Sequence, residues 1–286
     1  MFYQLLKSYM KRFPFPHRGL KYFLRLMRGF NLDKKQYLKK TIDGFFIYTN
    51  PNEHIQQQLF WYGYYEPELV EVIKKLVKPG DVFIDGGANI GYFSLLAAKY
   101  GATVFAFEPV SEVFEQLKIN LHINNEDKIT PIQKAFGDIV GEKEIYISGS
   151  DNRGMSSFER PENFSGASEI VDIIRLDDWV TEFQINKINI IKLDIEGSEL
   201  VALKGMETSL KEFKPLVITE VNLGTLSQFG IKPADIVNFM RKLNFEFFKI
   251  DEKGNLRFTE VDEIKRTTNI VFIHKDRKEF YKEIFN

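Results

Sequence analysis

Four acidic residues, each at the end of an apolar run, are the side chains best placed to do chemistry. They are Asp85, Glu108, Asp194 and Glu220. Each apolar run has the length of a β-strand, and ligands of a parallel sheet bind beyond the carboxyl ends of its strands. A carboxylate at such a place can accept a hydrogen bond from a sugar hydroxyl or take its proton. We therefore expect the four acids to line one binding site.

A glycine turn, DGGANIG at 85–91, joins the first of these strands to a helix. A dinucleotide-binding turn needs the pattern G-x-G-x-x-G, which lets a pyrophosphate approach the helix N-terminus, and Ala88 breaks that pattern. Asp85, immediately before the turn, disfavours a phosphate-rich ligand and favours a cationic one. S-adenosylmethionine (SAM) is such a ligand, because it carries a sulfonium and an ammonium and no phosphate. Glu108 can hold the ribose hydroxyls of either ligand and therefore does not discriminate between them. The acid before the glycines does discriminate, and it favours SAM over NAD.

Alternating strands and helices are predicted around these motifs. The expected strands span 81–85, 103–108, 130–136, 188–195, 215–221, 245–251 and 269–274. The expected helices span 67–77, 90–101, 111–124, 198–206 and 233–244. Strands with little polar alternation, separated by helices, indicate an α/β fold with a mainly parallel sheet and helices on both faces. A shorter strand pair is expected within 41–50, and a further strand at 141–148.

The sequence resembles the FkbM family of SAM-dependent methyltransferases, over roughly 62–221. The resemblance is carried by YGYYEP, FIDGGANIGYFSLLAA, FAFEP, AFGD, MSS, RLDDW, IIKLDIEGSELVALKG and ITEV. It implies a class I methyltransferase domain, with a Rossmann-like, seven-stranded sheet whose last strand is antiparallel. It also implies O-methylation, with SAM as donor, of a hydroxyl on a sugar, a glycan or a glycosylated metabolite.

The resemblance also implies which residues form the cofactor site. Those expected are Glu66, Asp85, Gly86, Gly87, Ala88, Asn89, Gly91, Phe107, Glu108, Pro109, Ala135, Phe136 and Asp194. Asp85, Gly87 and Asn89 would shape the methionine end, and the ribose would bind Glu108. Phe107 and Pro109 would flank the adenine ring, whose edge would be read by the backbone at 135–136.

Asp194 is the expected catalytic base or acceptor-orienting group, because it ends the strand that faces the acceptor in class I domains. Glu220 is the second candidate and Glu196 the third. Relatives often carry a histidine two residues after the acid that matches Glu220, but this chain has Asn222 there. The three acids can alternatively hold Mg²⁺, which prefers oxygen ligands, although a metal-independent reaction is favoured and no metal ligand is predicted. Glu199 is equally well explained as an acid that stabilises the first turn of a helix.

Segments outside the sheet are expected to recognise the acceptor. The aromatic run 60–65 can stack on sugar faces, although such clusters more often belong to a core. The insertion at about 141–172 contains a polar run, 148–169, that is predicted to form a lid or rim. Ser156 and Ser157 within it match a serine pair of the relatives.

Composition limits the other possibilities. The net charge of −1 gives no case for a nucleic-acid partner. The absence of cysteine removes disulfides and thiolate metal sites, and fits a reducing compartment. No apolar stretch reaches the ~18 residues of a membrane span, and no signal peptide is recognisable. We therefore predict a cytoplasmic protein whose methyltransferase domain spans 41–286.

Residues 1–40 are predicted to form a basic, amphipathic helical extension. Positions 1–32 hold seven Lys or Arg and no acid, with aromatic and aliphatic residues between them. Such a segment can bind an anionic membrane surface, here the inner one, or a partner protein in glycan assembly. The alternative is that it packs on the main domain and exposes its charges to solvent.

Two other functions remain open from the sequence. A protein with this fold can be a non-catalytic partner or scaffold in a glycan-assembly complex, with the basic segment as its interaction element. It can also be an NAD(P)-dependent oxidoreductase, although Ala88 and Asp85 argue against that cofactor.

Overall fold

The fold is built around one large sheet. The computed structural model describes residues 35–147, 156–160, 164 and 166–285. The sheet has the strand order β12-β11-β13-β10-β9-β3-β4-β5. Its strands are β3 (Val82–Gly86), β4 (Thr103–Phe107), β5 (Ile129–Ile132), β9 (Ile190–Leu193), β10 (Leu216–Val221), β11 (Phe245–Ile250), β12 (Leu256–Phe258) and β13 (Thr268–His274). Seven of them correspond to the predicted strands, and β12 is an unexpected eighth strand at the edge.

The strand directions match those of a class I methyltransferase. Strands β5, β4, β3, β9 and β10 are parallel to one another. The last strand, β13, lies antiparallel to both of its neighbours, β10 and β11. Strand order reverses at the β3–β9 pair, because the chain builds outwards through β4 and β5 before it returns to β9. Ligand sites of open α/β sheets lie at such a reversal, beyond the carboxyl ends of the strands.

Two hydrophobic cores cover the two faces of the sheet. Alternate residues of β10 divide between them: Leu216 and Ile218 belong to one core, and Val217 and Val221 to the other. The first core is covered by α4 (Pro67–Leu76), α5 (Tyr92–Lys99) and α6 (Ser111–Ile123), and the second by α7 (Leu176–Glu182), α8 (Glu199–Lys204), α9 (Glu207–Phe213) and α11 (Pro233–Lys242). The predicted arrangement of helices on both faces is therefore confirmed.

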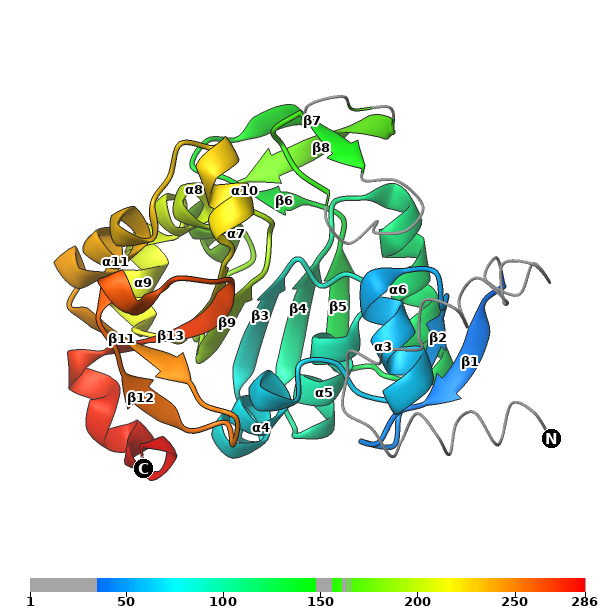
Figure 1. Cartoon of the computed structure of the whole chain (residues 1–286), viewed down its shortest axis with the longest axis horizontal. Helices are drawn as coiled ribbons and strands as arrows, with labels where there is room; N and C mark the ends of the chain where they lie inside the picture. Colours follow the sequence, from blue (N-terminus) through cyan, green and yellow to red (C-terminus); the bar gives the residue numbers. More distant parts are fainter. Residues whose placement is uncertain (1–34, 148–155, 161–163, 165, 286) are drawn as a thin grey trace.

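The predicted strand 130–136 is wrong as a continuous element. It divides into β5 in the large sheet and β6 (Ala135–Phe136), which belongs to a separate sheet of order β6-β8-β7. A turn closed by the Lys134 amide, which donates to the Ile132 carbonyl, separates the two parts. The small sheet also contains β7 (Gly141–Ile147) and β8 (Ala167–Ile174), and lies over the carboxyl end of β5 (Figure 1).

The insertion predicted at 141–172 is thus partly an antiparallel pair, β7 with β8. Most of the polar run between these strands lies outside the described residues, so its role as a lid stays a prediction. The basic segment 1–32 also lies outside them. The strand pair expected within 41–50 forms, but as β1 (Tyr37–Lys40) and β2 (Phe46–Thr49), with 41–45 as the turn.

The remaining helices are short or peripheral. They are α3 (His54–Tyr62), α10 (Leu223–Gln228), η3 (Val261–Glu263) and η4 (Lys275–Ile284). Within the described residues, no helix has both the length and the apolar character needed to cross a membrane.

Candidate active site

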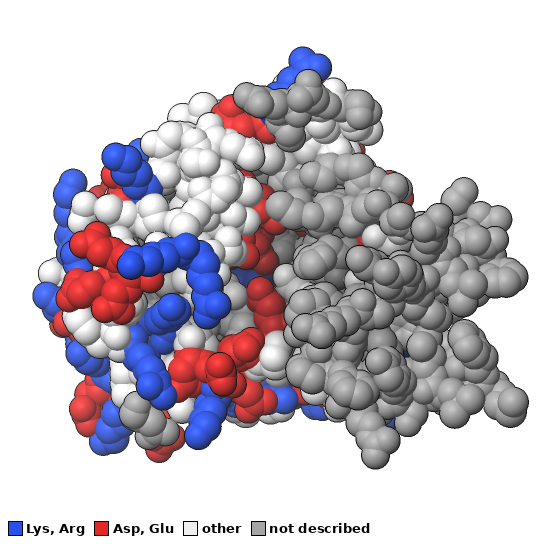
Figure 2. Space-filling view, viewed as in Figure 1, with Lys and Arg blue, Asp and Glu red and all other residues white. Residues whose placement is uncertain are grey.

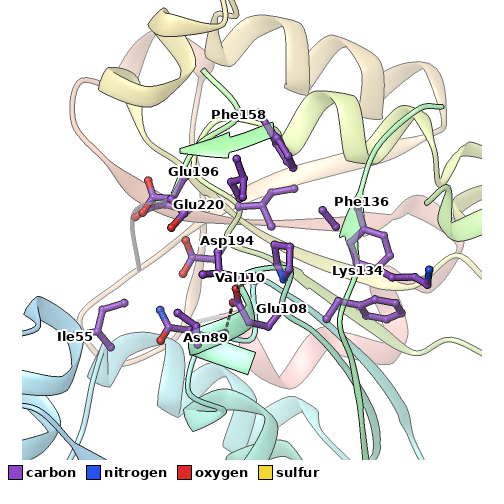
Figure 3. Close-up of a pocket in the computed structure, with 18 of the residues that line it drawn as sticks. Ile55, Asn89, Glu108, Val110, Lys134, Phe136, Phe158, Asp194, Glu196 and Glu220 are labelled. Atoms are coloured by element: carbon purple, nitrogen blue, oxygen red, sulfur yellow. Dashed lines mark hydrogen bonds between the residues drawn. The ribbon is translucent and has the colours of Figure 1, made fainter. Parts of the chain in front are cut away.

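A pocket opens at the carboxyl edge of the sheet, where β3, β4, β9 and β10 end (Figure 3). Many of the residues predicted for the site line it. They are Gly87, Asn89, Phe107, Glu108, Pro109, Ala135, Phe136, Asp194, Glu196 and Glu220. The large sheet brings most of them together, because parallel strands place their carboxyl ends at one edge, and Ala135 and Phe136 are added by β6 of the small sheet.

The glycine turn allows β3 and β9 to approach each other closely. Gly87 has a φ of 72°, and a Cβ atom there would lie 2.0 Å from the Asp194 carbonyl oxygen. Only glycine fits a left-handed conformation with so little space. The next part of the turn is held by Asn89, whose side-chain oxygen accepts a hydrogen bond from the Ile90 amide. The turn therefore fixes one wall of the pocket.

Glu108 follows β4 and lies in the middle of the pocket (Figure 3). One carboxylate oxygen accepts a hydrogen bond from the Asn89 amide at 3.0 Å, and the other accepts one from the Val110 amide at 3.0 Å. Burial raises the pKa of Glu108 to about 7. Each oxygen has a second lone pair, so the carboxylate can still accept hydrogen bonds from a bound ligand.

Five residues predicted to bind the cofactor do not line the pocket: Glu66, Asp85, Gly86, Ala88 and Gly91. Asp85 is fully buried beneath the turn, where it accepts a hydrogen bond from the Ser94 hydroxyl at 2.6 Å. The cation beside Asp85 in the structure is the Lys192 ammonium of the same chain, 3.4 Å away, so a contact between Asp85 and a cationic ligand stays a prediction. Gly86 and Gly91 instead provide space for neighbouring side chains, Leu193 and Leu117 respectively.

Lys192 connects the buried acid to the pocket. Its ammonium lies 3.4 Å from Asp85 and 3.7 Å from Asp194. Burial alone would lower the pKa of Lys192, but the Asp85 and Asp194 carboxylates hold it above its ordinary value. Lys192 is therefore a charged group beneath the site rather than a group that contacts a ligand.

Asp194, Glu196 and Glu220 form an acidic triad at one end of the pocket (Figure 3). One carboxylate oxygen from each lies within 4.8 Å of those from the other two. Burial, reinforced by Asp194, raises the pKa of Glu196 to about 8. Burial, reinforced by Asp194 and Glu196, raises the pKa of Glu220 to about 9. The triad can accept a proton or bind a cation, and Mg²⁺ dependence stays open as the sequence left it.

Glu199 has a structural role in the turn after β9. It is 1% exposed, and one of its oxygens accepts hydrogen bonds from the Ile195 amide at 3.3 Å and the Gly197 amide at 3.1 Å. The interpretation of Glu199 as an acid that stabilises the first turn of a helix therefore agrees with these contacts. Burial raises the pKa of Glu199 to about 7.

Glu66 lies in a neighbouring cleft instead of the pocket. That cleft is lined by the ends of β10, β11 and β13, and it shares Glu220 with the pocket. Thr268 and Asn269 of β13 also line it. Burial, with Asp194 adding to it, raises the pKa of Glu66 to about 7. Glu66 was predicted for the cofactor site, but it lines this cleft rather than the pocket, and the two cavities meet at Glu220.

Some residues that line the pocket were not predicted from the sequence as part of the site. They are Ile55, Val110, Val113 and Lys134, which lie in no motif that indicated the site, and Ile195, which lies in the motif IIKLDIEGSELVALKG but was not predicted for the site. Tyr65, Ile145, Ser156 and Phe158 also line the pocket, and all four belong to segments that the sequence had associated with acceptor binding. Phe60 and Trp61 of the same aromatic run are only 3% and 2% exposed, so they belong to the core.

Comparison with known families decides which enzyme this arrangement belongs to. The methyltransferase FkbM domain matches residues 85–247, more than half of the chain. The chain belongs to the FkbM methyltransferase family. This FkbM methyltransferase is accordingly a SAM-dependent enzyme, which argues against the oxidoreductase and scaffold alternatives.

Known relatives are similar at modest identity. The chain is 27% identical to the hexuronic acid methyltransferase AglP of Haloferax volcanii over 196 residues, 65% of this chain and 73% of that protein. It is 29% identical to the 31-O-demethyl-FK506 methyltransferase FkbM of Streptomyces tacrolimicus over 161 residues, 46% of this chain and 61% of that protein.

A solved structure also aligns with this FkbM methyltransferase. It is methyltransferase FkbM from Methylobacillus flagellatus, with 21% identity and a TM-score of 0.45. The alignment covers 68% of this chain and 43% of that one. With so low a score, it adds nothing to the family assignment.

Proposed function

We propose that this enzyme transfers a methyl group from SAM to a hydroxyl of a sugar, a glycan or a glycosylated metabolite. The observation that carries the proposal is the pocket itself, which has a buried carboxylate, Glu108, in its middle and the acidic triad at one end. The family membership supports the donor. The sugar is supported by the name of the relative AglP, a hexuronic acid methyltransferase.

The pocket residues suggest how SAM would lie. Phe107, Pro109, Ala135 and Phe136 would surround the adenine, and Glu108 would bind the ribose hydroxyls. Gly87 and Asn89 would then border the methionine part, near Asp194. Bound SAM supplies an electrophilic methyl group on a good leaving group. The protein must hold the acceptor oxygen in line with it, about 3 Å from the methyl carbon.

Asp194 is the proposed base, because it is the member of the acidic triad that lies toward Glu108 and the middle of the pocket (Figure 3). The raised pKa values of Glu196 and Glu220 keep a proton on each at neutral pH before SAM binds. Glu220 borders both the pocket and the neighbouring cleft, so it would orient the acceptor between them. The cleft also presents Thr268, Asn269 and Arg266, whose hydroxyl, amide and guanidinium groups suit a polyhydroxylated acceptor.

Calorimetric titration tests the donor part of the proposal. SAM and its product S-adenosylhomocysteine (SAH) should bind, whereas NAD(P)H should not. Glu108→Ala should weaken SAM roughly tenfold to hundredfold, because a charged group that accepts hydrogen bonds is lost. Glu115→Ala is the matched control, since Glu115 is an exposed acid on the neighbouring helix α6. A folded protein that binds neither SAM nor SAH would contradict the proposal.

Acceptor screening tests the remaining part. Sugars, uronic acids and glycosylated metabolites would be incubated with radiolabelled SAM, in EDTA and in Mg²⁺. Transfer to hydroxyls in EDTA is expected. Transfer to nitrogen or carbon acceptors alone would contradict the proposed chemistry.

Residues 1–32 keep the role that the sequence suggests for them. We propose that this segment attaches the protein, in the cytoplasm, to the inner membrane surface or to a glycan-assembly partner.

A further inference from the structure

Acidic side chains are concentrated at one end of the pocket. Figure 3 shows the side chains of Asp194, Glu196 and Glu220 gathered on one side, with Phe136 and Lys134 on the opposite side and Glu108 between them. If the adenine occupies the aromatic side and the ribose binds Glu108, the next part of SAM to reach the triad is its sulfur. In the space-filling view of Figure 2, acidic side chains are gathered near the middle of the visible face of the molecule.

The described part of the chain provides little positive charge to balance the triad. Lys192, the buried cation beneath it, is shared between Asp85 and Asp194. Lys134 lies at the other end of the pocket and pairs with Asp172 at 2.9 Å. Among the described residues, neither Glu196 nor Glu220 has an ion pair, and one Glu196 oxygen is buried without a hydrogen-bond partner.

The donor and the product of methyl transfer differ in charge at the sulfur atom. SAM carries a sulfonium cation there, and SAH carries a neutral thioether. Their other groups are the same. A carboxylate cluster in a partly buried site interacts strongly with a nearby cation and is unfavourable without one. The triad is therefore placed to distinguish the two ligands by charge.

We propose that Asp194, Glu196 and Glu220 are the counter-ion of the sulfonium, so that the protein binds SAM more tightly than SAH. This inference rests on the proposed binding of SAM in the pocket. Loss of the methyl group removes the charge, and the product is then held less tightly than the donor. The triad would thus contribute to donor selection and to product release, in addition to any role in proton transfer.

The experiment compares three ligands by calorimetry in EDTA. SAM has a sulfonium, sinefungin has an amine that is protonated at neutral pH in the equivalent position, and SAH is neutral there. SAM and sinefungin should each bind roughly tenfold to hundredfold more tightly than SAH. They should also release more protons than SAH, measured in buffers of different ionisation enthalpy, because the cation promotes ionisation of Glu196 and Glu220. The charged and titratable groups facing these two acids are Tyr65, Glu66, Asp194 and Glu199, and Lys192 faces Asp194.

Variants show whether the triad causes the preference. Glu196→Gln and Glu220→Gln should reduce the SAM-to-SAH affinity ratio several-fold, while SAH affinity is retained and reports a folded site. Glu115→Gln, on α6, should leave the ratio unchanged. Equal affinity of SAM, sinefungin and SAH for the wild type, or an unchanged ratio in both variants, would overturn the inference but not the proposed function. Failure of all three ligands to bind would overturn both, and Mg²⁺ that binds alone and blocks SAM would assign the triad to a metal.

Discussion

Lys192 and Asp85 are cross-strand partners, and the Lys192 ammonium lies 3.4 Å from an Asp85 carboxylate oxygen. Both side chains are buried, with 3% and 0% exposure. The pair connects β9 to β3 directly beneath the glycine turn. Because Lys192 also lies 3.7 Å from Asp194, the same cation supports the turn and one member of the acidic triad.

Removal of the Lys192 charge should destabilise the protein strongly. Lys192→Met leaves a buried carboxylate uncompensated, so we expect a loss of about 3–5 kcal/mol in the free energy of unfolding. Urea unfolding followed by circular dichroism measures it. Lys187→Met is the control, because Lys187 is 50% exposed and 3.9 Å from Asp81, and it should cost less than about 1 kcal/mol. Similar losses for both variants would show that the buried pair has no special role.

Gly87 should not tolerate even one methyl group. A Cβ at Gly87 would lie 2.0 Å from the Asp194 carbonyl, whereas a Cβ at Gly80 meets nothing within 4 Å. Both glycines have positive φ, 72° and 84°, so the backbone strain is common to the two substitutions. Gly80→Ala should cost about 1 kcal/mol, and Gly87→Ala at least about 3 kcal/mol. Thermal unfolding compares them, and Gly87→Ala should also abolish SAM binding in calorimetry. Equal losses of stability in the two variants would mean that the turn at Gly87 moves to make room for the methyl group.

Asp194→Asn should separate catalysis from cofactor binding. The amide keeps the shape of the side chain but cannot take a proton, so kcat should fall roughly 10²–10⁴-fold. SAM affinity should change by less than about tenfold, since Glu196 and Glu220 still face the sulfonium. Methyl transfer to an acceptor found by screening gives kcat, and calorimetry gives the affinity. Asp178→Asn, at a 53% exposed position on α7, should change neither. An unchanged kcat for Asp194→Asn would move the base to Glu220.

The ligand-free protein should become less stable as the pH rises through neutrality. Burial raises the pKa of Glu196 to about 8 and of Glu220 to about 9, from an ordinary value of 4.5. From about pH 4.5 up to pH 8 to 9, the folded state therefore binds more protons than the unfolded state, and its free energy of unfolding declines as the pH increases. The contribution of these groups is complete below about pH 4.5 and is lost as the pH passes 8 to 9.

Glutamine variants isolate that contribution. Glu196→Gln and Glu220→Gln should each flatten the decline of unfolding free energy between about pH 5 and pH 9. The matched control is Glu246→Gln, a partly exposed acid that pairs with Lys278. Denaturant unfolding across the pH series gives the slopes. Parallel curves for the wild type and both triad variants would contradict the raised pKa values.

The sequence by itself determined the sheet and its helices. Apolar strands that lack polar alternation must be covered on both faces, and the amphipathic spacing of Leu69, Val72, Ile73 and Leu76 predicted α4 almost to the residue. It also determined that Glu108, Asp194 and Glu220 would meet, because residues at the carboxyl ends of parallel strands share an edge. What the sequence missed in the fold was local, such as the turn that separates β5 from β6.

Only the tertiary structure decided which acids face the pocket and which are paired inside the protein. Asp85 and Asp194 both end strands, but the register of β3 with β9 places Lys192 opposite Asp85 and turns that acid away from the pocket. Glu66 lies in the neighbouring cleft for a similar reason, since its position depends on the packing of α4 against α5 and β11. Sequence motifs specify residue types and spacing along the chain, whereas ion pairing and burial depend on neighbours that are distant in the sequence.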